Sequence, residues 1–490
     1  MISASDTRAA ADGAEPATVD WRAAPTAAEA AALYRPPAPY PVSPTRALLR
    51  AIVNLERDLI TLLPAEAYRA LDFKLGSSRR GIYMINAPET VRLATGARLD
   101  DFPKNDLMVG ALKPVVGESI FVSSGALWER QRRMTEPAFG QLRINRAFVH
   151  MAGAMADGEA RFDAAAARGE RLSLEAEMSH LTADMIYRTI FSEPLAPGIA
   201  GQVFDAFARF QRAVANVELR RLLFSPAWQE IPQPAPARRA ATEIRNLLAE
   251  MLRARRSLMA SGSCPDDIAA DIVAARDPET GEGFTDEEML DQLGVFFMAG
   301  HETTASVLTW AVFMLSQQPG AVSRMRREID AVAGDGPIAL AHIKRLAFTR
   351  AVFRETLRLY PPVTFLARVA MREGPLGALT LPRGAMVLIS PWTIQRHEAL
   401  WPHADRFDPD RFSPERESEI APGTYLPFGI GPRVCIGSGF AMMEAGLILA
   451  SLIRRYDVET MAPGRVRAVA RLTTRPARDI SVRLRRRGGA

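Results

Sequence analysis

The chain has 490 residues, of which 48% are apolar, 24% charged and 7% aromatic, which is ordinary for a soluble globular protein. No run approaches the roughly 18 to 20 consecutive apolar residues of a membrane-spanning helix. The net charge is +5, and lysine occurs only at positions 74, 104, 113 and 344, so arginine supplies nearly all of the 61 positive charges. No aromatic-interleaved or repeated basic motif accompanies them, so the charge favours an acidic protein partner over nucleic acid.

The predicted elements are mostly helices. Residues 1–31 contain acids among the arginines and no apolar segment, which argues against a secretory signal and predicts a disordered leader of a cytoplasmic protein. Apolar periodicity then predicts helices at 47–63, from 89, and at 128–135, 145–168, 174–191, 199–217, 236–261, 286–317, 319–332, 346–360 and 436–455. Strands are predicted at 80–86, 380–381 and 386–388, with a hairpin of 466–472 and 480–484. The predicted fold class is therefore mainly α with small β-sheets.

Only two cysteines occur, Cys264 and Cys435. This count excludes an iron–sulfur cluster or a four-cysteine zinc site within the chain. A disulfide between the two is an alternative, but two cysteines in a long chain of cytosolic character are usually both reduced.

A glycine-rich loop at 428–437, Phe-Gly-Ile-Gly-Pro-Arg-Val-Cys-Ile-Gly, brings Cys435 to the start of the last predicted helix. Unsatisfied N–H groups and the helix dipole favour a thiolate there. Gly431 and Gly437 allow the backbone to approach a large flat group. Arg433 adds a positive charge suited to a carboxylate of that group.

The loop resembles the Phe-x-x-Gly-x-Arg-x-Cys-x-Gly signature of the cytochrome P-450 superfamily, and every fixed position is present. The resemblance implies that Cys435 is the thiolate ligand of the iron of haem b, where the sulfur pushes electron density into the metal. Phe428 would shield one side of the sulfur. The alternative is a buried structural cysteine after a glycine-rich turn.

A second motif, Ala-Gly-His-Glu-Thr-Thr at 299–304, lies in the middle of an apolar helix, where an acid and two hydroxyls are costly unless used. By resemblance this helix crosses the distal face of the haem at Ala299 and Gly300, and Gly300 leaves room for a small ligand. Glu302 and Thr303 would be the acid–alcohol pair that delivers protons to dioxygen. A kinked core helix with a threonine bonded to the carbonyl four residues earlier is the alternative.

Further residues match the family in the same order along the chain. Glu355 and Arg358 alone would be a weak surface pair, but with Arg411 they resemble the family's buried structural triad. Trp128, Arg132 and Arg368 resemble the anchors of the haem propionates, and Gln131 stands where many relatives carry histidine.

The resemblance spans about residues 128–437 and implies a single triangular haem domain at 32–490. It implies a soluble, bacterial-type monooxygenase that hydroxylates or epoxidises a fatty acid, terpenoid, steroid or polyketide. We expect a monomer that receives electrons from a separate ferredoxin or flavodoxin with its NAD(P)H reductase, because the chain has no Gly-x-Gly-x-x-Gly loop. The rival interpretations are a peroxide-driven hydroxylase or haem-thiolate isomerase, and a haem-based binder or sensor without turnover. The expected substrate lining comprises 102–121, 204–223, Phe296, Ala299 and 363–366.

Overall fold

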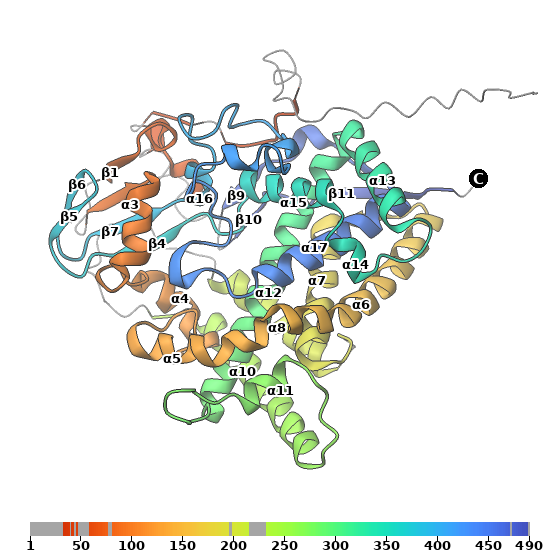
Figure 1. The fold of residues 1–490 in the computed structure, drawn as a ribbon, viewed down its shortest axis with the longest axis horizontal. Helices are drawn as coiled ribbons and strands as arrows, with labels where there is room; N and C mark the ends of the chain where they lie inside the picture. Colours follow the sequence, from red (N-terminus) through yellow and green to blue (C-terminus); the bar gives the residue numbers. More distant parts are fainter. Residues whose placement is uncertain are drawn as a thin grey trace, which may run out of the picture.

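Long helices form most of the molecule and lie on one side of a smaller β-rich part (Figure 1). The computed structural model describes residues 33–39, 41–43, 46–47, 58–76, 81–195, 198–214, 232–470 and 473–488. The helices are α3 Pro88–Arg92, α4 Asp106–Val116, α5 Gly125–Thr135, α6 Gln141–Ala167, α7 Leu174–Phe191, α8 Ile199–Val214, α10 Ala235–Ala260, α11 Ile268–Ala274, α12 Asp286–Ser316, α13 Pro319–Ala333, α14 Leu340–Ile343, α15 Ala347–Leu359, α16 Pro391–Ile394 and α17 Ser438–Arg455. Single turns add η1 Ile60–Leu62, η2 Ala65–Tyr68, η3 Leu93–Ala97, η4 Leu99–Asp101, η5 Glu136–Phe139, η6 Pro409–Phe412, η7 Glu417–Glu419, η8 Gly431–Arg433 and η9 Pro463–Arg465.

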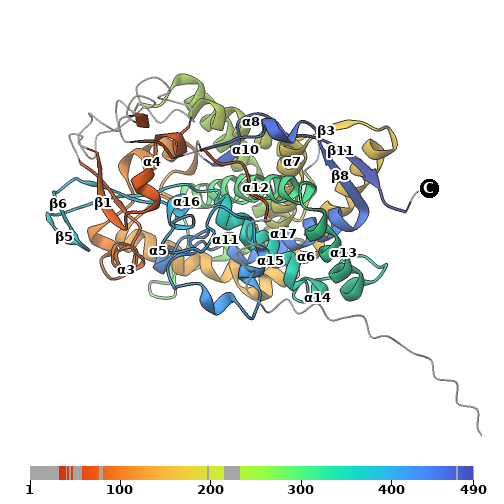
Figure 2. The ribbon, with the colours of Figure 1, turned by 90° about the horizontal axis from the view of Figure 1, so that it is seen from above.

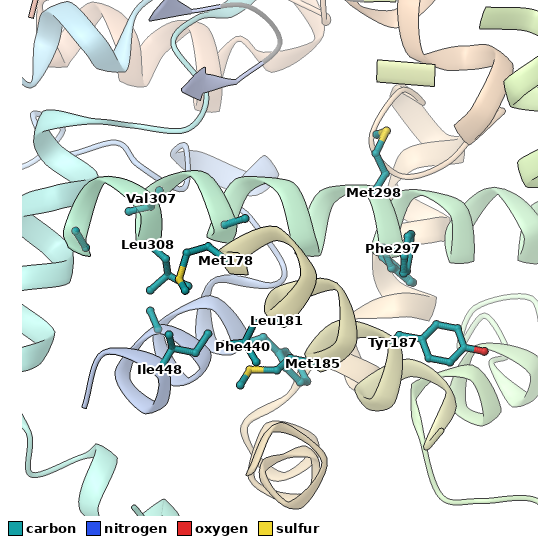
Figure 3. Packing of buried hydrophobic residues seen from close by; sticks show 14 of the residues in the cluster. Met178, Leu181, Met185, Tyr187, Phe297, Met298, Val307, Leu308, Phe440 and Ile448 are labelled. Atoms are coloured by element: carbon teal, nitrogen blue, oxygen red, sulfur yellow. The ribbon is translucent and has the colours of Figure 1, made fainter. Parts of the chain in front are cut away.

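Helix α12 is the central element. Most of its residues are buried, as expected of a helix with neighbours on all sides. A capping box starts it: the Thr285 hydroxyl accepts from the Glu288 N–H (3.2 Å), and the Glu288 carboxylate accepts from the Thr285 N–H (2.8 Å). Side chains of α7 and α17 pack beneath α12 (Figure 3). This packing fixes the distance between the helix that carries the 299–304 motif and the helix that follows Cys435.

The β-rich part is built around a four-stranded sheet in the order β1-β2-β7-β4, at one end of the molecule (Figure 2). Its strands are β1 Asp72–Gly76, β2 Ile82–Ile85, β7 Met386–Ile389 and β4 Leu366–Val369, and β2 pairs with β7 in parallel while the other pairs are antiparallel. A hairpin of β5 Gly374–Leu376 and β6 Leu379–Leu381 extends from it. The sheet brings β4, which carries Arg368, next to the segment of Lys104 through an isolated bridge.

The hairpin predicted from 466–472 and 480–484 is wrong. The turn comes earlier, so that β9 Ala468–Ala470 pairs with β10 Thr474–Pro476. The last strand, β11 Ser481–Arg486, lies between β3 Arg171–Ser173 and β8 Tyr456–Thr460 in a separate sheet. The alternation of 480–484 was recognised, but its partners are distant in sequence and could not be assigned.

The predicted helix boundaries agree with the structure to within a few residues in most cases, and α7 begins and ends as predicted. Helix α17 begins at Ser438, two residues later than predicted, because the Cys435 N–H bonds to the Phe428 carbonyl (2.9 Å) and keeps the loop open. The predictions for 1–31 and for most of 47–63 fall outside the described residues.

Candidate functional site

The Cys435 loop is shaped by two glycines in the left-handed region, Gly429 (φ 75°) and Gly431 (φ 76°). A side chain at Gly431 would collide with the backbone carbonyl of Thr95 in η3, so glycine is required there for close approach as well as for φ. Phe428 packs against the main core and accepts the Cys435 N–H. The loop is thus fixed at both ends of the turn that presents the sulfur.

Cys435 is exposed although it lies deep among protein atoms, as expected of a side chain that lines an internal space. Burial raises the pKa of its thiol, while the Gly437 N–H, Arg132 and Lys104 lower it without cancelling the rise. The sequence predicted a local environment that favours thiolate, and these three groups are that environment. In the chain alone, desolvation outweighs them.

Three cations gather beside the loop. Arg368 is 5% exposed, and burial lowers its pKa to about 10. Burial and the charge of Arg368 lower the pKa of Arg433 to about 10 as well. Lys104 is half-buried, and desolvation, Arg368 and Arg433 all lower its pKa while Cys435 raises it. Arg368 Nε and Arg433 Nη1 are buried without a hydrogen-bond partner, so the cluster has donors in place for an anion.

Sequence reasoning missed Lys104. The residue falls in the range 102–121, which was predicted to line the substrate. Its ammonium donates to the carbonyl of Phe121 and lies 3.9 Å from the centroid of that ring. The only available signal was a lysine in a chain that otherwise uses arginine.

Helix α5 presents Trp128 and Arg132 to the same region. The guanidinium carbon of Arg433 lies 4.3 Å from the Trp128 ring centroid, a cation–π contact. Arg132 donates to the Val434 carbonyl (2.9 Å) next to the cysteine and to Glu136 (3.1 Å). Gln131 is fully buried. Its amide oxygen accepts from the Ser123 hydroxyl (2.6 Å) and its amide nitrogen donates to the Glu118 carbonyl (2.7 Å), so Gln131 holds the loop before α5 in place.

In the middle of α12 the burial is interrupted. Ala299 is exposed and Gly300 and Thr303 are partly exposed, between long buried stretches of the helix. The Thr303 hydroxyl donates to the Ala299 carbonyl (2.7 Å), which is the back-bonded conformation weighed from the sequence. These residues form an open strip on α12.

Two expectations for α12 need correction. A Cβ on Gly300 would lie 2.7 Å from Cγ1 of Ile186 on α7, so the glycine serves close helix packing and the predicted room for a ligand is not on its side. Phe296 is buried with its ring centroid 4.7 Å from that of Phe139, and Phe139 in turn contacts Phe440 of α17. Phe296 is therefore a core residue and not substrate lining.

Glu302 points away from the open strip. Its side chain is 9% exposed and accepts from Gln211 of α8, from the Thr473 hydroxyl (2.8 Å) and from Arg475 of β10. Consecutive residues of a helix do not face the same way, so the expected acid–alcohol pair is adjacent in sequence but divided between two sides of α12.

The predicted structural triad is brought together in the interior. Glu355 and Arg358 are fully buried and form two hydrogen bonds of 2.7 Å, and Arg411 Nε lies 3.5 Å from the same carboxylate. Arg358 also donates to the carbonyls of residues 395, 404 and 406. The triad therefore joins α15 to the long segment before the Cys435 loop.

A haem fits the donor set of this site. It offers an iron to the Cys435 sulfur and two carboxylates to cations. The buried orphan donors of Arg368 and Arg433, with Lys104 beside them, are the groups such carboxylates require. Gly437, which precedes α17, has no atom closer to its Cβ position than the Cys435 sulfur at 4.0 Å, so the backbone leaves the thiol accessible there.

The model of the cytochrome P450 family matches residues 69–477. Cyclooctatin synthase of Streptomyces melanosporofaciens is 35% identical over 89% of this chain and 92% of its own. Cyclooctat-9-en-7-ol 5-monooxygenase of the same organism is 33% identical over 80% and 83%, and pentalenene oxygenase of Streptomyces avermitilis is 30% identical over 81% and 86%. The solved haem domain of cytochrome P450DA superposes with a TM-score of 0.77 over 92% of this chain and 99% of that one, at 23% identity.

Proposed function

The chain belongs to the cytochrome P450 family and is a haem-thiolate monooxygenase, and we propose that it hydroxylates or epoxidises a cyclic terpenoid. The observation that carries the proposal is the open strip of α12, with Ala299 and Thr303, in a molecule whose Cys435 thiol is exposed next to three cations. No helix among the described residues could span a membrane.

Different residues bind the cofactor and transfer the proton in this proposal. Bound haem supplies the redox chemistry that activates dioxygen. Cys435 Sγ would ligate the iron, and Arg368, Arg433, Lys104, Trp128 and Arg132 would hold the propionate side. Thr303 Oγ1, once its hydrogen turns from the Ala299 carbonyl, donates a proton into the open side of α12. Glu302 resupplies that proton from the other side of the helix.

A terpenoid substrate is favoured by two observations. Three relatives bear names that refer to cyclooctatin, cyclooctat-9-en-7-ol and pentalenene. The described residues of the expected lining are largely apolar, and Lys104 is turned to Phe121 and the cation cluster. The basic pair Arg220-Arg221, which would suit a carboxylate substrate, lies outside the described residues. Electrons come from a separate ferredoxin or flavodoxin in this proposal.

A spectral screen tests the substrate class. The panel contains pentalenene, cyclooctat-9-en-7-ol, a long-chain fatty acid, a steroid and an aromatic polyketide, and the readout is displacement of water from ferric haem. We expect the largest low-spin to high-spin shift with a terpenoid. A larger shift with the fatty acid, with turnover to match, would contradict the terpenoid assignment.

Thr303→Val tests oxygen activation against the peroxide-driven and binding interpretations. Without the hydroxyl, electrons still enter but protons are misdirected, so we expect oxygen and reductant consumption to continue while most electron pairs leave as hydrogen peroxide. Product and peroxide are counted per electron pair. Thr309→Val is the matched control, because Thr309 is a fully buried threonine of the same helix whose hydroxyl likewise donates to the carbonyl four residues earlier (2.8 Å). Unchanged coupling in Thr303→Val favours the peroxide-driven rival, and no oxygen consumption by the unmodified enzyme favours the binder.

A further inference from the structure

Glu302 is the meeting point of three elements. Its Oε2 accepts from Gln211 of α8, and its Oε1 accepts from both Thr473 and Arg475 at the start of β10. An ionised carboxylate is a pure acceptor, so all three contacts suit the charged form. These three donors hold the Glu302 carboxylate in place.

Strand β10, which carries Arg475, is hydrogen-bonded to neighbouring segments. The preceding Thr474 hydroxyl donates to the Pro361 carbonyl (2.6 Å), and the Thr474 carbonyl accepts from Ser306 and from the indole of Trp310 (3.4 Å), both on α12. Strand β10 is therefore fixed to the same helix that carries Glu302. Any motion in the contact belongs to the guanidinium and not to the strand.

Arg475 has a second carboxylate within reach. Its Nη1 lies 3.7 Å from Oε1 of Glu175 in the first turn of α7, while its Nη2 contacts Glu302. The two acids differ in environment, because the Glu175 side chain is 33% exposed and that of Glu302 is 9% exposed. The other titratable neighbour, His301, is buried with Nδ1 bonded to the Phe297 carbonyl (2.9 Å), and burial lowers its pKa.

We propose that Arg475 is a positioning residue with two stations, which moves from Glu302 to Glu175 each time Glu302 takes up a proton and returns when the proton leaves for Thr303. The inference rests on the proposed role of Glu302 in proton delivery. A proton on Glu302 cancels the charge that attracts the guanidinium. Among the residues that the structure describes, Glu175 is the other carboxylate that pairs with Arg475.

Glu175 lowers the free-energy cost of separating Arg475 from Glu302. A guanidinium that leaves Glu302 with no second partner would be left half-buried and unpaired. With Glu175 at 3.7 Å it exchanges one ion pair for another through a side-chain rotation. The arrangement joins the exposed start of α7 to the buried face of α12 without opening α12 to water.

Glu175→Gln removes the second station and leaves Glu302 and Arg475 in place. We expect product formation to slow by about two- to fivefold, the factor that a partly exposed ion pair can supply, with KM for the terpenoid unchanged. The solvent isotope effect on kcat should change with it. Arg478→Gln is the control, because it removes one charge from an exposed side chain three residues beyond Arg475.

A second variant makes the result specific. When Glu302 is already replaced by Gln, Glu175→Gln should have no further effect. With Glu302 intact, Arg475→Lys, which keeps the charge, should retain more activity than Arg475→Gln. All variants are compared as holoenzymes by their carbon monoxide spectra. The proposal is overturned if Glu175→Gln equals the unmodified enzyme, or if its effect persists unchanged without Glu302. If Glu302→Gln alone leaves rate and coupling unchanged, the failure lies in the proposed function and the two-station mechanism falls with it.

Discussion

At the scale of single residues, the site brings together cationic side chains, two of which have buried N–H donors without partners among the described residues. Arg368, Arg433 and Lys104 are brought together with little solvent, and each has its pKa lowered mainly by burial. Such a cluster is unfavourable until carboxylates reach it. These three cations repel one another in the protein without haem, and the haem carboxylates would relieve that repulsion. The cluster therefore favours retention of the cofactor.

Arg368→Leu should raise the rate of haem loss about tenfold or more, because a charge-assisted hydrogen bond to a buried carboxylate contributes about 1.5 to 3 kcal/mol. Haem transfer to a scavenging globin measures the rate. Arg467→Leu, an exposed arginine next to β9, is the control. A variant that keeps haem as long as the unmodified protein would remove Arg368 from the anchoring set.

The same cluster predicts a pH dependence of haem retention. Without haem, Arg368 and Arg433 have pKa values of about 10. A bound carboxylate raises the pKa of both, so the haem complex binds more protons than the haem-free chain and its affinity falls as pH rises through about 10. Haem transfer should accelerate there, and less so in Arg368→Leu. A rate that falls with rising pH in this window would contradict the assignment.

At the scale of elements, the buried triad fixes α15 to the segment before the Cys435 loop. Glu355→Gln would leave Arg358, which is fully buried, without its counter-charge, and we expect a loss of about 3 to 5 kcal/mol in the free energy of unfolding. Glu417→Gln is the matched control: it breaks the half-exposed pair with Arg354 of the same helix and should cost less than about 1 kcal/mol. Denaturant unfolding of both variants measures the difference, and equal costs would show that the buried triad stabilises the fold no more than the half-exposed pair does.

Long periodic helices could be predicted from the sequence, and the elements set by distant partners could not. Helix α7 and the central α12 have strong apolar patterns, and their ends follow from local capping. The pairing of β11 with β3 and the direction of the Glu302 side chain depend on residues far away in the chain. For the site, the motifs located Cys435 and Thr303, while Lys104 and Arg475 belong to no motif.

Glu444 of α17 shows the same limit. It is buried, desolvation raises its pKa well above the usual range, and the Thr304 side chain is its hydrogen-bonding neighbour. Nothing in its apolar helical surroundings marked it as a group next to α12. Only the packing of α17 on α12 reveals the contact.

At the scale of the whole molecule, much of the surplus arginine is paired. Arg130 contacts Glu288 (2.6 Å), and Arg133 contacts Asp277 (3.2 Å) and Glu279 (2.8 Å), so the positive charge of these two residues is partly neutralised. The number of arginines therefore overestimates the positive electrostatic potential that a redox partner would encounter at this surface.

We still expect electron transfer from an acidic ferredoxin to slow as salt rises, because screening shortens from about 30 Å at 0.01 M to about 8 Å at 0.15 M ionic strength. Arg133→Gln should leave that dependence nearly unchanged, because the charge of Arg133 is already met by two acids. Stopped-flow reduction across this range measures the rate in both proteins. A rate independent of salt would argue against electrostatic steering of the redox partner.

The central claim is that Cys435 provides the thiolate ligand of the haem, and the carbon monoxide spectrum of the reduced protein tests it most directly. The red-shifted Soret band peculiar to thiolate ligation should persist in Cys264→Ser, where the thiol lies between α10 and α11 beside Arg255 (3.8 Å), and should be lost in Cys435→Ser. A band that survives in Cys435→Ser and disappears in Cys264→Ser would contradict the assignment of the site.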